Sequence, residues 1–288
     1  MLLTSVLKSR DRSLFGAILL AIASLSVAPV TERAVVARTR TGLLTLYLRG
    51  SRTHGPAVVL EAGLGDSSDS WSKVASAITG AQVVRYDRAG LGRSARVTEP
   101  RIASQIASEL HDALVDAHIQ PPYVLVSHSA GAWYVVVFAA QHPREVSGLL
   151  LVDPTPPDFF SEISSLQTQQ ERREFNSSMA TYEAQASPGR RAEWMARNKA
   201  ASEAKAAVLR NDVAFVVISA AASQPGRSGA IREYWRQQHE RMAAGMPKGR
   251  LVVANAGHYV QLEQPQIVVR EIQRMLVLVN HSDRPAFR

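Results

Sequence analysis

Short apolar runs rich in β-branched residues alternate along this chain with longer stretches in which apolar residues recur every third or fourth position. The short runs have the length and composition of buried strands, whereas the longer period is that of a helix with one face against a core. Two such helical stripes cover 102–114 and 267–276. Strands are predicted at 43–48, 57–62, 82–86, 123–127, 146–152, 213–221 and 250–254. The alternation predicts an α/β protein with a mostly parallel central sheet and helices on both of its faces.

One region departs from this alternation. Residues 155–210 contain no clear strand pattern, and polar helix formers with scattered aromatic residues dominate there. We predict a helical segment that is inserted between two strands and acts as a lid. A packed helical subdomain with no gating role fits the same pattern. On this division the core consists of residues 29–154 and 211–288.

The first residues have the pattern of a secretory leader. Three basic residues between positions 8 and 12 precede an apolar run over 14–28, whose end, Ser26-Val27-Ala28, has the small-x-small form of a cleavage site. We therefore predict that residues 1–28 are a signal peptide and that the protein is exported to the periplasm or the extracellular space. An uncleaved anchor that tethers the protein to a membrane is the alternative, although the run is shorter than the roughly 20 residues of a spanning helix.

Composition changes this picture little. Apolar residues make up 46% of the 288-residue chain and charged residues 20%, as is typical of a protein with a globular core. The formal net charge is +8, but the basic residues are dispersed among 25 acidic ones, without an aromatic-rich basic stripe or a zinc-binding spacing. No nucleic-acid partner is predicted. Cysteine is absent, which excludes disulfides and thiolate chemistry.

Candidate chemistry begins where a predicted strand runs into Ser127-His128-Ser129-Ala130-Gly131 and then into a helical stretch. A sharp strand-turn-helix corner strains the backbone of its central residue and tolerates only small residues two positions before and after it. Such a corner presents the Ser129 hydroxyl at the C-terminal edge of the sheet, beside a helix N-terminus that favours negative charge. These residues resemble the nucleophile elbow, G-x-S-x-G, of the α/β-hydrolase family, with Ser127 in place of the first glycine.

A serine needs a base to become a nucleophile, and His258 is the candidate among the eight histidines. It follows the last predicted strand on a loop, whereas the others lie in helices, at turns, in charged segments or, for His128, beside the nucleophile. The resemblance implies the chain order nucleophile, acid, histidine. Ser129 and His258 satisfy this order.

The resemblance leaves two candidates for the acid that orients the imidazole. Many relatives carry it after the strand that corresponds to 213–221, but the loop at 222–229 has no carboxylate. Other branches of the family, the haloalkane dehalogenases among them, carry it at the end of the preceding strand, where this chain has Asp153. Asp153 is therefore the expected acid, and Glu233, within a helical stretch, is the competing candidate.

Acyl transfer also needs donors for the negatively charged oxygen of the tetrahedral intermediate. The resemblance implies that the backbone N–H of Ala130, directly after the nucleophile, is one of them. The residues at 61–65, Glu-Ala-Gly-Leu-Gly, resemble the family's H-G-x-G oxyanion motif, which makes the Leu64 N–H the second donor. The turn at 86–94 and Trp71 also match the family's pattern, and we assign structural roles to them.

Together these motifs predict a serine hydrolase that cleaves a carboxylic ester or a related acyl bond of a small molecule, with no cofactor and no metal. A serine at 129 disfavours dehalogenase or epoxide hydrolase chemistry, which demands aspartate there. A non-catalytic α/β-hydrolase scaffold used for binding or signalling is the alternative. A dinucleotide-binding oxidoreductase is disfavoured because Ser68 stands where the third glycine of that fingerprint belongs.

Overall fold

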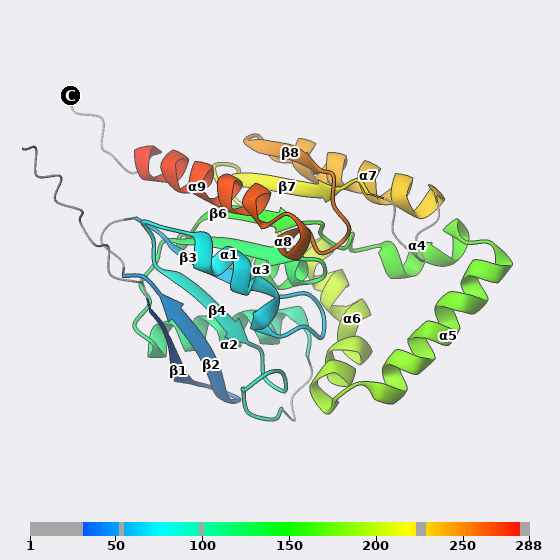
Figure 1. The fold of residues 1–288 in the computed structure, drawn as a ribbon, viewed down its shortest axis with the longest axis horizontal. Coiled ribbons are helices and arrows are strands. Elements are labelled where there is room, and N and C mark those ends of the chain that lie inside the picture. Colours follow the sequence, from blue (N-terminus) through cyan, green and yellow to red (C-terminus); the bar gives the residue numbers. More distant parts are fainter. Residues whose placement is uncertain (1–30, 52–54, 98–100, 223–228, 283–288) are drawn as a thin grey trace, which may run out of the picture. The chain divides into compact units, whose positions relative to one another are not determined.

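The computed structural model describes residues 31–51, 55–97, 101–222 and 229–282, whose fold is drawn in Figure 1. The predicted leader, residues 1–28, lies outside the described residues, as does most of the loop at 222–229. Within the described ranges, no helix combines the length and the apolar character that a membrane crossing requires.

An eight-stranded sheet forms the centre of the described chain, with the strand order β1-β2-β4-β3-β5-β6-β7-β8. β2 pairs antiparallel with both β1 and β4, and all other neighbouring strands pair in parallel. The strands are β1 (Glu32–Thr39), β2 (Gly42–Arg49), β3 (Ala57–Glu61), β4 (Val83–Asp87), β5 (Tyr123–His128), β6 (Val146–Val152), β7 (Ala214–Ala220) and β8 (Gly249–Ala254). The mostly parallel sheet is confirmed, and a strand lies at each of the seven predicted places.

β1 is the strand that the sequence analysis missed. It lies at the edge of the sheet, most of its residues are exposed, and its apolar run, residues 34–37, is only four residues long. Its pairing with β2 extends over all of Glu32–Thr39. An edge strand of this kind is held by its backbone hydrogen bonds and shows only a weak pattern in its side chains.

Helices cover both faces of the sheet. Successive strand residues point to opposite faces, so each strand contributes to the packing on both sides. Leu125 and Leu149 point into a buried cluster with residues of α2 and α3, whereas Val126 and Leu150 point into a second cluster with residues of α1 and α9. The helices are η1 (Ser68–Trp71), α1 (Ser72–Ala77), α2 (Ala103–Asp116), α3 (Gly131–Gln141), α4 (Phe159–Leu166), α5 (Gln169–Gln185), α6 (Pro188–Ala206), α7 (Gly229–Ala244), α8 (Val260–Glu263) and α9 (Pro265–Ser282).

The region predicted as a helical insertion is helical and consists of α4, α5 and α6, between β6 and β7 (Figure 1). Capping signals separate its helices. Thr168 forms a capping box with Glu171 at the start of α5, and Ser187 caps α6 directly ahead of Pro188. Both caps satisfy backbone N–H groups that have no partner within the helix.

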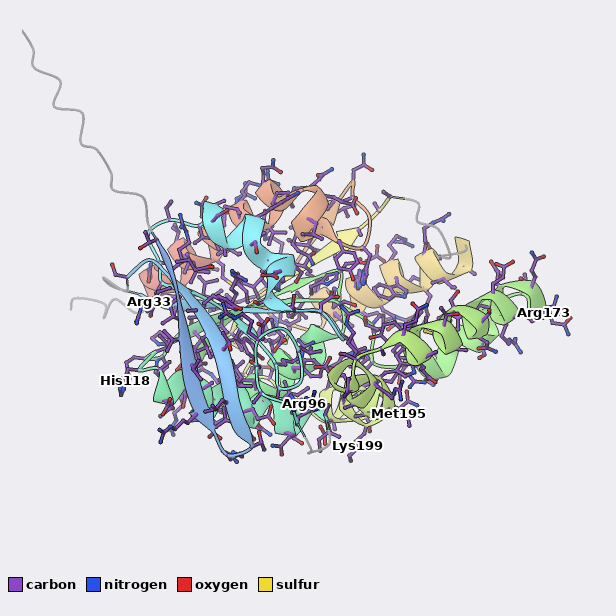
Figure 2. All side chains as sticks on the ribbon, turned by 60° about the horizontal axis from the view of Figure 1, so that its bottom comes forward. Arg33, Arg96, His118, Arg173, Met195 and Lys199 are labelled. Carbon is purple, nitrogen blue, oxygen red and sulfur yellow. The ribbon has the colours of Figure 1, made fainter. Side chains whose placement is uncertain are left out.

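α6 joins the insertion to the core, as does α4, whose Phe159 and Ile163 are buried with Ile231 and Trp235 of α7. α5, which is described in full, buries none of its residues, and Figure 1 shows it farther from the sheet than α6. α6 places Ala200, Ala201 and Ala204 in the buried cluster that contains α3. The other side of the insertion is exposed, with Met195 of α6 and Arg173 of α5 pointing outward (Figure 2).

Gly131 allows the start of α3 to approach the end of β3, because a Cβ there would clash with the carbonyl oxygen of Ala62. We predict that Gly131→Ala lowers the free energy of unfolding by about 1–3 kcal/mol, the usual cost of overpacking. The loss is expected although alanine is the better helix former by up to ~1 kcal/mol. Urea denaturation measures the change.

Gly229→Ala is the matched control for this substitution. Among the described residues, a Cβ at Gly229, the first residue of α7, would approach only the end of the Arg232 side chain, at 4.0 Å. The control should leave the stability unchanged or raise it slightly. If Gly131→Ala is as stable as this control, the close approach of α3 to β3 does not constrain the fold.

Candidate active site

Ser129 lies at the corner between β5 and α3, where the parallel strands end. Its φ of 54° is in the left-handed region, which costs a residue other than glycine about 1–3 kcal/mol. Three backbone hydrogen bonds hold this conformation. The Ser129 N–H donates to the Val152 carbonyl at 3.0 Å, and the Ser129 carbonyl accepts from the N–H groups of Thr155 at 3.1 Å and Ala132 at 3.2 Å. Ser127, which replaces the family's first glycine, is fully buried in β5. The corner therefore accommodates serine at this position.

His258 lies on the loop between β8 and α8, with its ring against the corner. The Ser129 hydroxyl donates to the His258 Nε2, with a separation of 2.9 Å. The loop is held by His128, whose Nε2 donates to the carbonyl oxygen of His258 at 2.9 Å. The sequence analysis set His128 aside. No local signal could have revealed this contact, because it joins residues 130 positions apart.

Asp153 follows β6 directly and completes a line of side chains with His258 and Ser129. Its Oδ2 accepts from the His258 Nδ1–H at 2.6 Å, and its Oδ1 accepts from the Ala220 N–H at 3.0 Å. The side chain is 1% exposed, and the residue has a φ of 41°, so the chain bends sharply at the end of the strand. A carboxylate in this place keeps a proton on Nδ1 and leaves Nε2 free to accept one.

The competing acid, Glu233, is engaged elsewhere. It is exposed on α7, where its carboxylate accepts from the Arg236 guanidinium at 2.6 Å. This bond, together with one from Gln237, lowers the pKa of Glu233 to about 2. Of the two acids that the sequence left open, the structure brings Asp153 to the imidazole.

Thr155 is a contact of Ser129 that the sequence analysis did not single out. Its Oγ1 lies 3.0 Å from the Ser129 Oγ, and its carbonyl accepts from the Trp133 Nε1–H at 2.8 Å. The indole therefore fixes the main chain at Thr155. The Ser129 hydroxyl has a second polar partner besides the imidazole.

His239 is fully buried behind Asp153, although its neighbours in the sequence are charged. Its Nε2 donates to the Pro154 carbonyl at 2.8 Å. Its Nδ1 lies 2.8 Å from the Ser219 Oγ and 3.9 Å from the Asp153 Oδ1. These contacts tie the chain directly after Asp153 to α7 and to β7.

The two predicted oxyanion donors lie in segments that meet at the corner. Ala130 directly precedes α3, at the positive end of the helix dipole. Residues 61–65, named here the oxyanion segment, pass beside the corner, since a Cβ at Gly63 would lie 3.4 Å from the Ser129 Cβ and 3.0 Å from the His128 Nδ1. The segment can lie this close because position 63 has no side chain. The donor roles of Ala130 and Leu64 remain a prediction.

Asp66 and Tyr259 form a polar pair at the same edge of the sheet. Burial raises the pKa of Asp66, and the Tyr259 hydroxyl donates to its carboxylate. Burial and the negative charge of Asp66 raise the pKa of Tyr259 to about 12. The phenol therefore keeps its proton at neutral pH. Tyr259 follows His258 directly, and its ring centroid lies 4.7 Å from that of His128.

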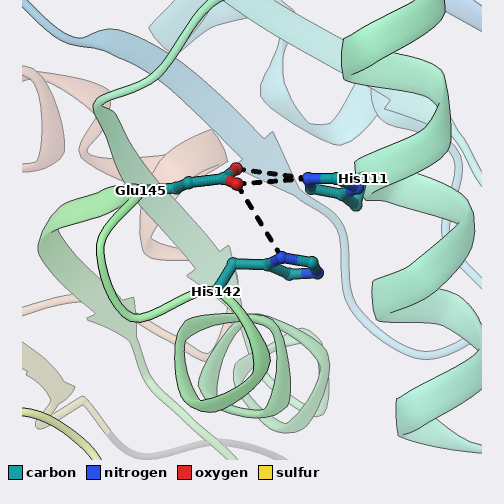
Figure 3. A group of neighbouring side chains, drawn as sticks. All are labelled: His111, His142 and Glu145. Carbon is teal, nitrogen blue, oxygen red and sulfur yellow. Dashed lines mark hydrogen bonds and ion pairs between the residues drawn. The ribbon is translucent and has the colours of Figure 1, made fainter.

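A separate cluster of His111, His142 and Glu145 brings three potential metal ligands within 4.8 Å of one another (Figure 3). It lies at the N-terminal end of β6, the opposite end of this strand from Asp153. The two imidazoles are stacked, with centroids 3.9 Å apart and planes 1° from parallel. A cation binds an imidazole nitrogen from within the plane of the ring. Because the two ring planes are parallel and stacked, no single cation can lie in both of them. In this arrangement the cluster is a stacked pair beside one carboxylate rather than a coordination site.

The sequence profile of the alpha/beta hydrolase family matches residues 58–271, and the chain belongs to this family. The match begins in β3 and ends in α9. It therefore includes Ser129, Asp153 and His258, as well as the helical insertion.

Curated relatives match only part of the chain. The uncharacterized protein YqjL of Bacillus subtilis is 36% identical over 115 residues, which cover 40% of this chain and 45% of YqjL. An AB hydrolase superfamily protein of Gibberella zeae is 36% identical over 103 residues, 34% of this chain and 32% of that protein. The chain thus spans less than half the length of these two relatives.

Solved structures resemble the chain over most of its length. The enol-lactonase of Burkholderia xenovorans LB400 has a TM-score of 0.58 and 19% identity, covering 84% of this chain and 100% of that one. A thermophilic esterase of Thermogutta terrifontis has a TM-score of 0.59 and 17% identity, covering 86% of this chain and 99% of that one. At these identities the likeness shows the fold alone.

We predict that Asp153→Asn lowers the turnover of a p-nitrophenyl ester by roughly 10³- to 10⁴-fold, because an amide favours the wrong imidazole tautomer. Steady-state kinetics on the purified protein measures the loss. Glu233→Gln is the control, and its turnover should stay within about twofold of wild type, as is usual for an exposed charge away from a site. The opposite ranking of the two variants would refute the assignment of Asp153.

Proposed function

We propose that this protein is a serine hydrolase that cleaves a carboxylic ester, or a related acyl bond, of a small molecule through an acyl-enzyme intermediate. The observation that carries the proposal is the continuous hydrogen-bonded line from Asp153 through His258 to Ser129, with separations of 2.6 Å and 2.9 Å. Both separations are within reach of proton transfer. The strained backbone of Ser129 adds support, since such strain persists where function requires it.

In the first half of the proposed reaction, the Ser129 Oγ attacks the acyl carbon while the His258 Nε2 takes the hydroxyl proton. Asp153 stabilises the imidazolium that forms, through the bond to Nδ1. The N–H groups of Leu64 and Ala130 donate to the oxyanion of the tetrahedral intermediate. The protonated His258 then passes its proton to the leaving alcohol, and the acyl group stays on Ser129.

In the second half, a water molecule takes the place of the alcohol. The His258 Nε2 removes a proton from this water as the water oxygen attacks the acyl carbon, and the same two N–H groups hold the new oxyanion. When the intermediate collapses, the proton returns from His258 to the Ser129 oxygen. The acid product leaves, and the enzyme is regenerated.

The nucleophile favours an acyl bond as the target. Serine at 129 leads to an acyl-enzyme, whereas the alkyl-enzyme esters of dehalogenases and epoxide hydrolases need a carboxylate at this position. A screen of p-nitrophenyl esters of increasing chain length, compared by kcat/KM, would identify the preferred acyl group.

We predict that a fluorophosphonate probe labels the wild-type protein covalently and that Ser129→Ala abolishes the labelling, because the probe reacts only with an activated serine. Gel fluorescence and intact-protein mass spectrometry measure the adduct. Ser147→Ala is the control, since Ser147 lies at the opposite end of β6 from Asp153, and this variant should label like wild type. An unlabelled wild-type protein would instead favour a binding scaffold.

The leader pattern of residues 1–28 supports a further part of the proposal, that the enzyme is exported. Cell fractionation followed by N-terminal analysis of the exported form tests this part. A mature chain that begins after Ala28 is the expected result. A full-length chain in the membrane fraction would indicate an uncleaved anchor, and a full-length chain in the cytoplasm would contradict export.

A further inference from the structure

Arg88 lies beside the oxyanion segment, fully buried, and uses all five of its guanidinium N–H groups. Nε donates to Glu193 at 2.6 Å. Nη1 donates to Glu61 and, at 2.9 Å, to the Ala62 carbonyl. Nη2 donates to the Gly63 carbonyl at 2.6 Å and to Glu193 at 2.9 Å. One side chain therefore holds two successive carbonyl groups of the oxyanion segment.

The bond from Arg88 to the Gly63 carbonyl fixes the direction of the Leu64 N–H. These two groups belong to one peptide unit, and in a trans peptide the carbonyl and the N–H point in opposite directions. While the Gly63 carbonyl points at the buried guanidinium, the Leu64 N–H is turned away from it. A flip of this peptide would break the bond and place an acceptor where the oxyanion needs a donor.

Glu193 holds both Arg88 and the next peptide along the chain. Its Oε2 accepts from the Gly65 N–H at 2.7 Å as well as from Arg88. Leu64 is thus held on both sides, through the carbonyl before it and the N–H after it. Glu193 belongs to α6 and lies 128 positions from Gly65, so the helical insertion supplies this support.

Burial makes the pair of Arg88 and Glu193 a strong constraint. The Glu193 side chain is 0% exposed and that of Arg88 is 1% exposed. Glu61, whose side chain is also buried, accepts from the guanidinium only through Nη1, whereas Glu193 accepts from both Nε and Nη2. Without the Glu193 carboxylate, two of the five guanidinium N–H groups lose their acceptor in a buried place, a cost that loosens the hold of Arg88 on the oxyanion segment.

α6 is seated on the core at this point. A Cβ at Gly189 would clash with the Gly90 carbonyl, so the start of the helix lies directly on the turn that follows Arg88. The Arg190 Nε donates to the Gly65 carbonyl at 2.7 Å. α6 therefore contacts Gly65 at both its N–H and its carbonyl.

We propose that Glu193 is a positioning residue, which holds Arg88 and Gly65 so that the Leu64 N–H stays directed at the oxyanion. The chemical meaning of this inference rests on the acyl transfer proposed above, whereas the ordering of the oxyanion segment is a property of the folded chain. The helical insertion is then part of the catalytic apparatus. Because the oxyanion exists only during the chemical step, a change at Glu193 alters kcat more than KM.

Glu193→Gln is the test variant, since it keeps the shape of the side chain and removes its charge. Glu203→Gln is the matched control. Glu203 is another carboxylate of α6 that joins the insertion to the core, but it accepts from Ser104, at the start of α2, at 2.9 Å and 3.1 Å. Loosening of the insertion as a whole would therefore affect both variants alike.

With p-nitrophenyl acetate as the probe, kcat of Glu193→Gln is expected to fall about 10- to 100-fold with KM changed less than about threefold, somewhat below the cost of losing an oxyanion donor outright. Hydrogen–deuterium exchange, which needs no activity, is expected to be faster at the amides of the oxyanion segment. Glu203→Gln should show neither effect. Wild-type kcat and exchange in Glu193→Gln, or equal losses in both variants, would overturn the inference.

Two further outcomes are decided by the same measurements. If the wild-type protein reacts with neither the ester nor the fluorophosphonate, the proposed function fails, and the role of Glu193 is tested by hydrogen–deuterium exchange alone. Faster exchange in Glu193→Gln that is confined to the oxyanion segment supports the ordering role of Glu193. Unchanged exchange overturns it. If Glu193→Gln does not fold, Glu193→Asp replaces it, because aspartate keeps the charge but is one methylene too short to reach both Arg88 and Gly65. A smaller fall in kcat with faster exchange supports the inference, and wild-type values overturn it.

Discussion

The site depends on the parallel pairing of β5, β6, β7 and β8, which brings the ends of these strands to one edge of the sheet. The Asp153–His258 hydrogen bond joins the ends of β6 and β8, although β7 lies between them. β7 takes part in this contact, because the Ala220 N–H at its end donates to the other oxygen of Asp153. A shift of register by one residue at any of these pairings would turn the side chains to the wrong face and separate the groups.

Local strain and buried charge both occur at this edge. Ser129 and Asp153 both have a positive φ, and each follows a central strand directly. Arg88 and Glu193 are charged residues in the protein interior, where most side chains are apolar. Each of these features costs stability, and each is held by several hydrogen bonds from different elements. The cost is consistent with a site whose geometry matters more to the protein than its local stability.

The helices of the insertion differ in how they relate to the core. α6 packs against α3 and places Glu193 beneath the oxyanion segment, so it belongs to the core as much as the sheet does. α5 lies outside it and buries none of its residues. The same insertion therefore contains a helix that packs into the core and a helix that buries none of its residues. One fold can host many different reactions, which is why membership of the family does not specify the bond that is cleaved.

The sequence by itself determined the class of fold, seven of the eight strands of the sheet, the elbow at Ser129 and the loop histidine. These features have local signals, namely apolar periodicity and small residues at a sharp corner. The family resemblance pointed to Asp153, but only the tertiary structure placed it at the imidazole with Glu233 bonded elsewhere, and only the tertiary structure revealed the contacts of His128, His239 and Glu193. Each of these contacts joins residues far apart in the chain, so no local pattern encodes it. A buried histidine or glutamate has the same appearance in a sequence as an exposed one, and only packing decides which groups it meets.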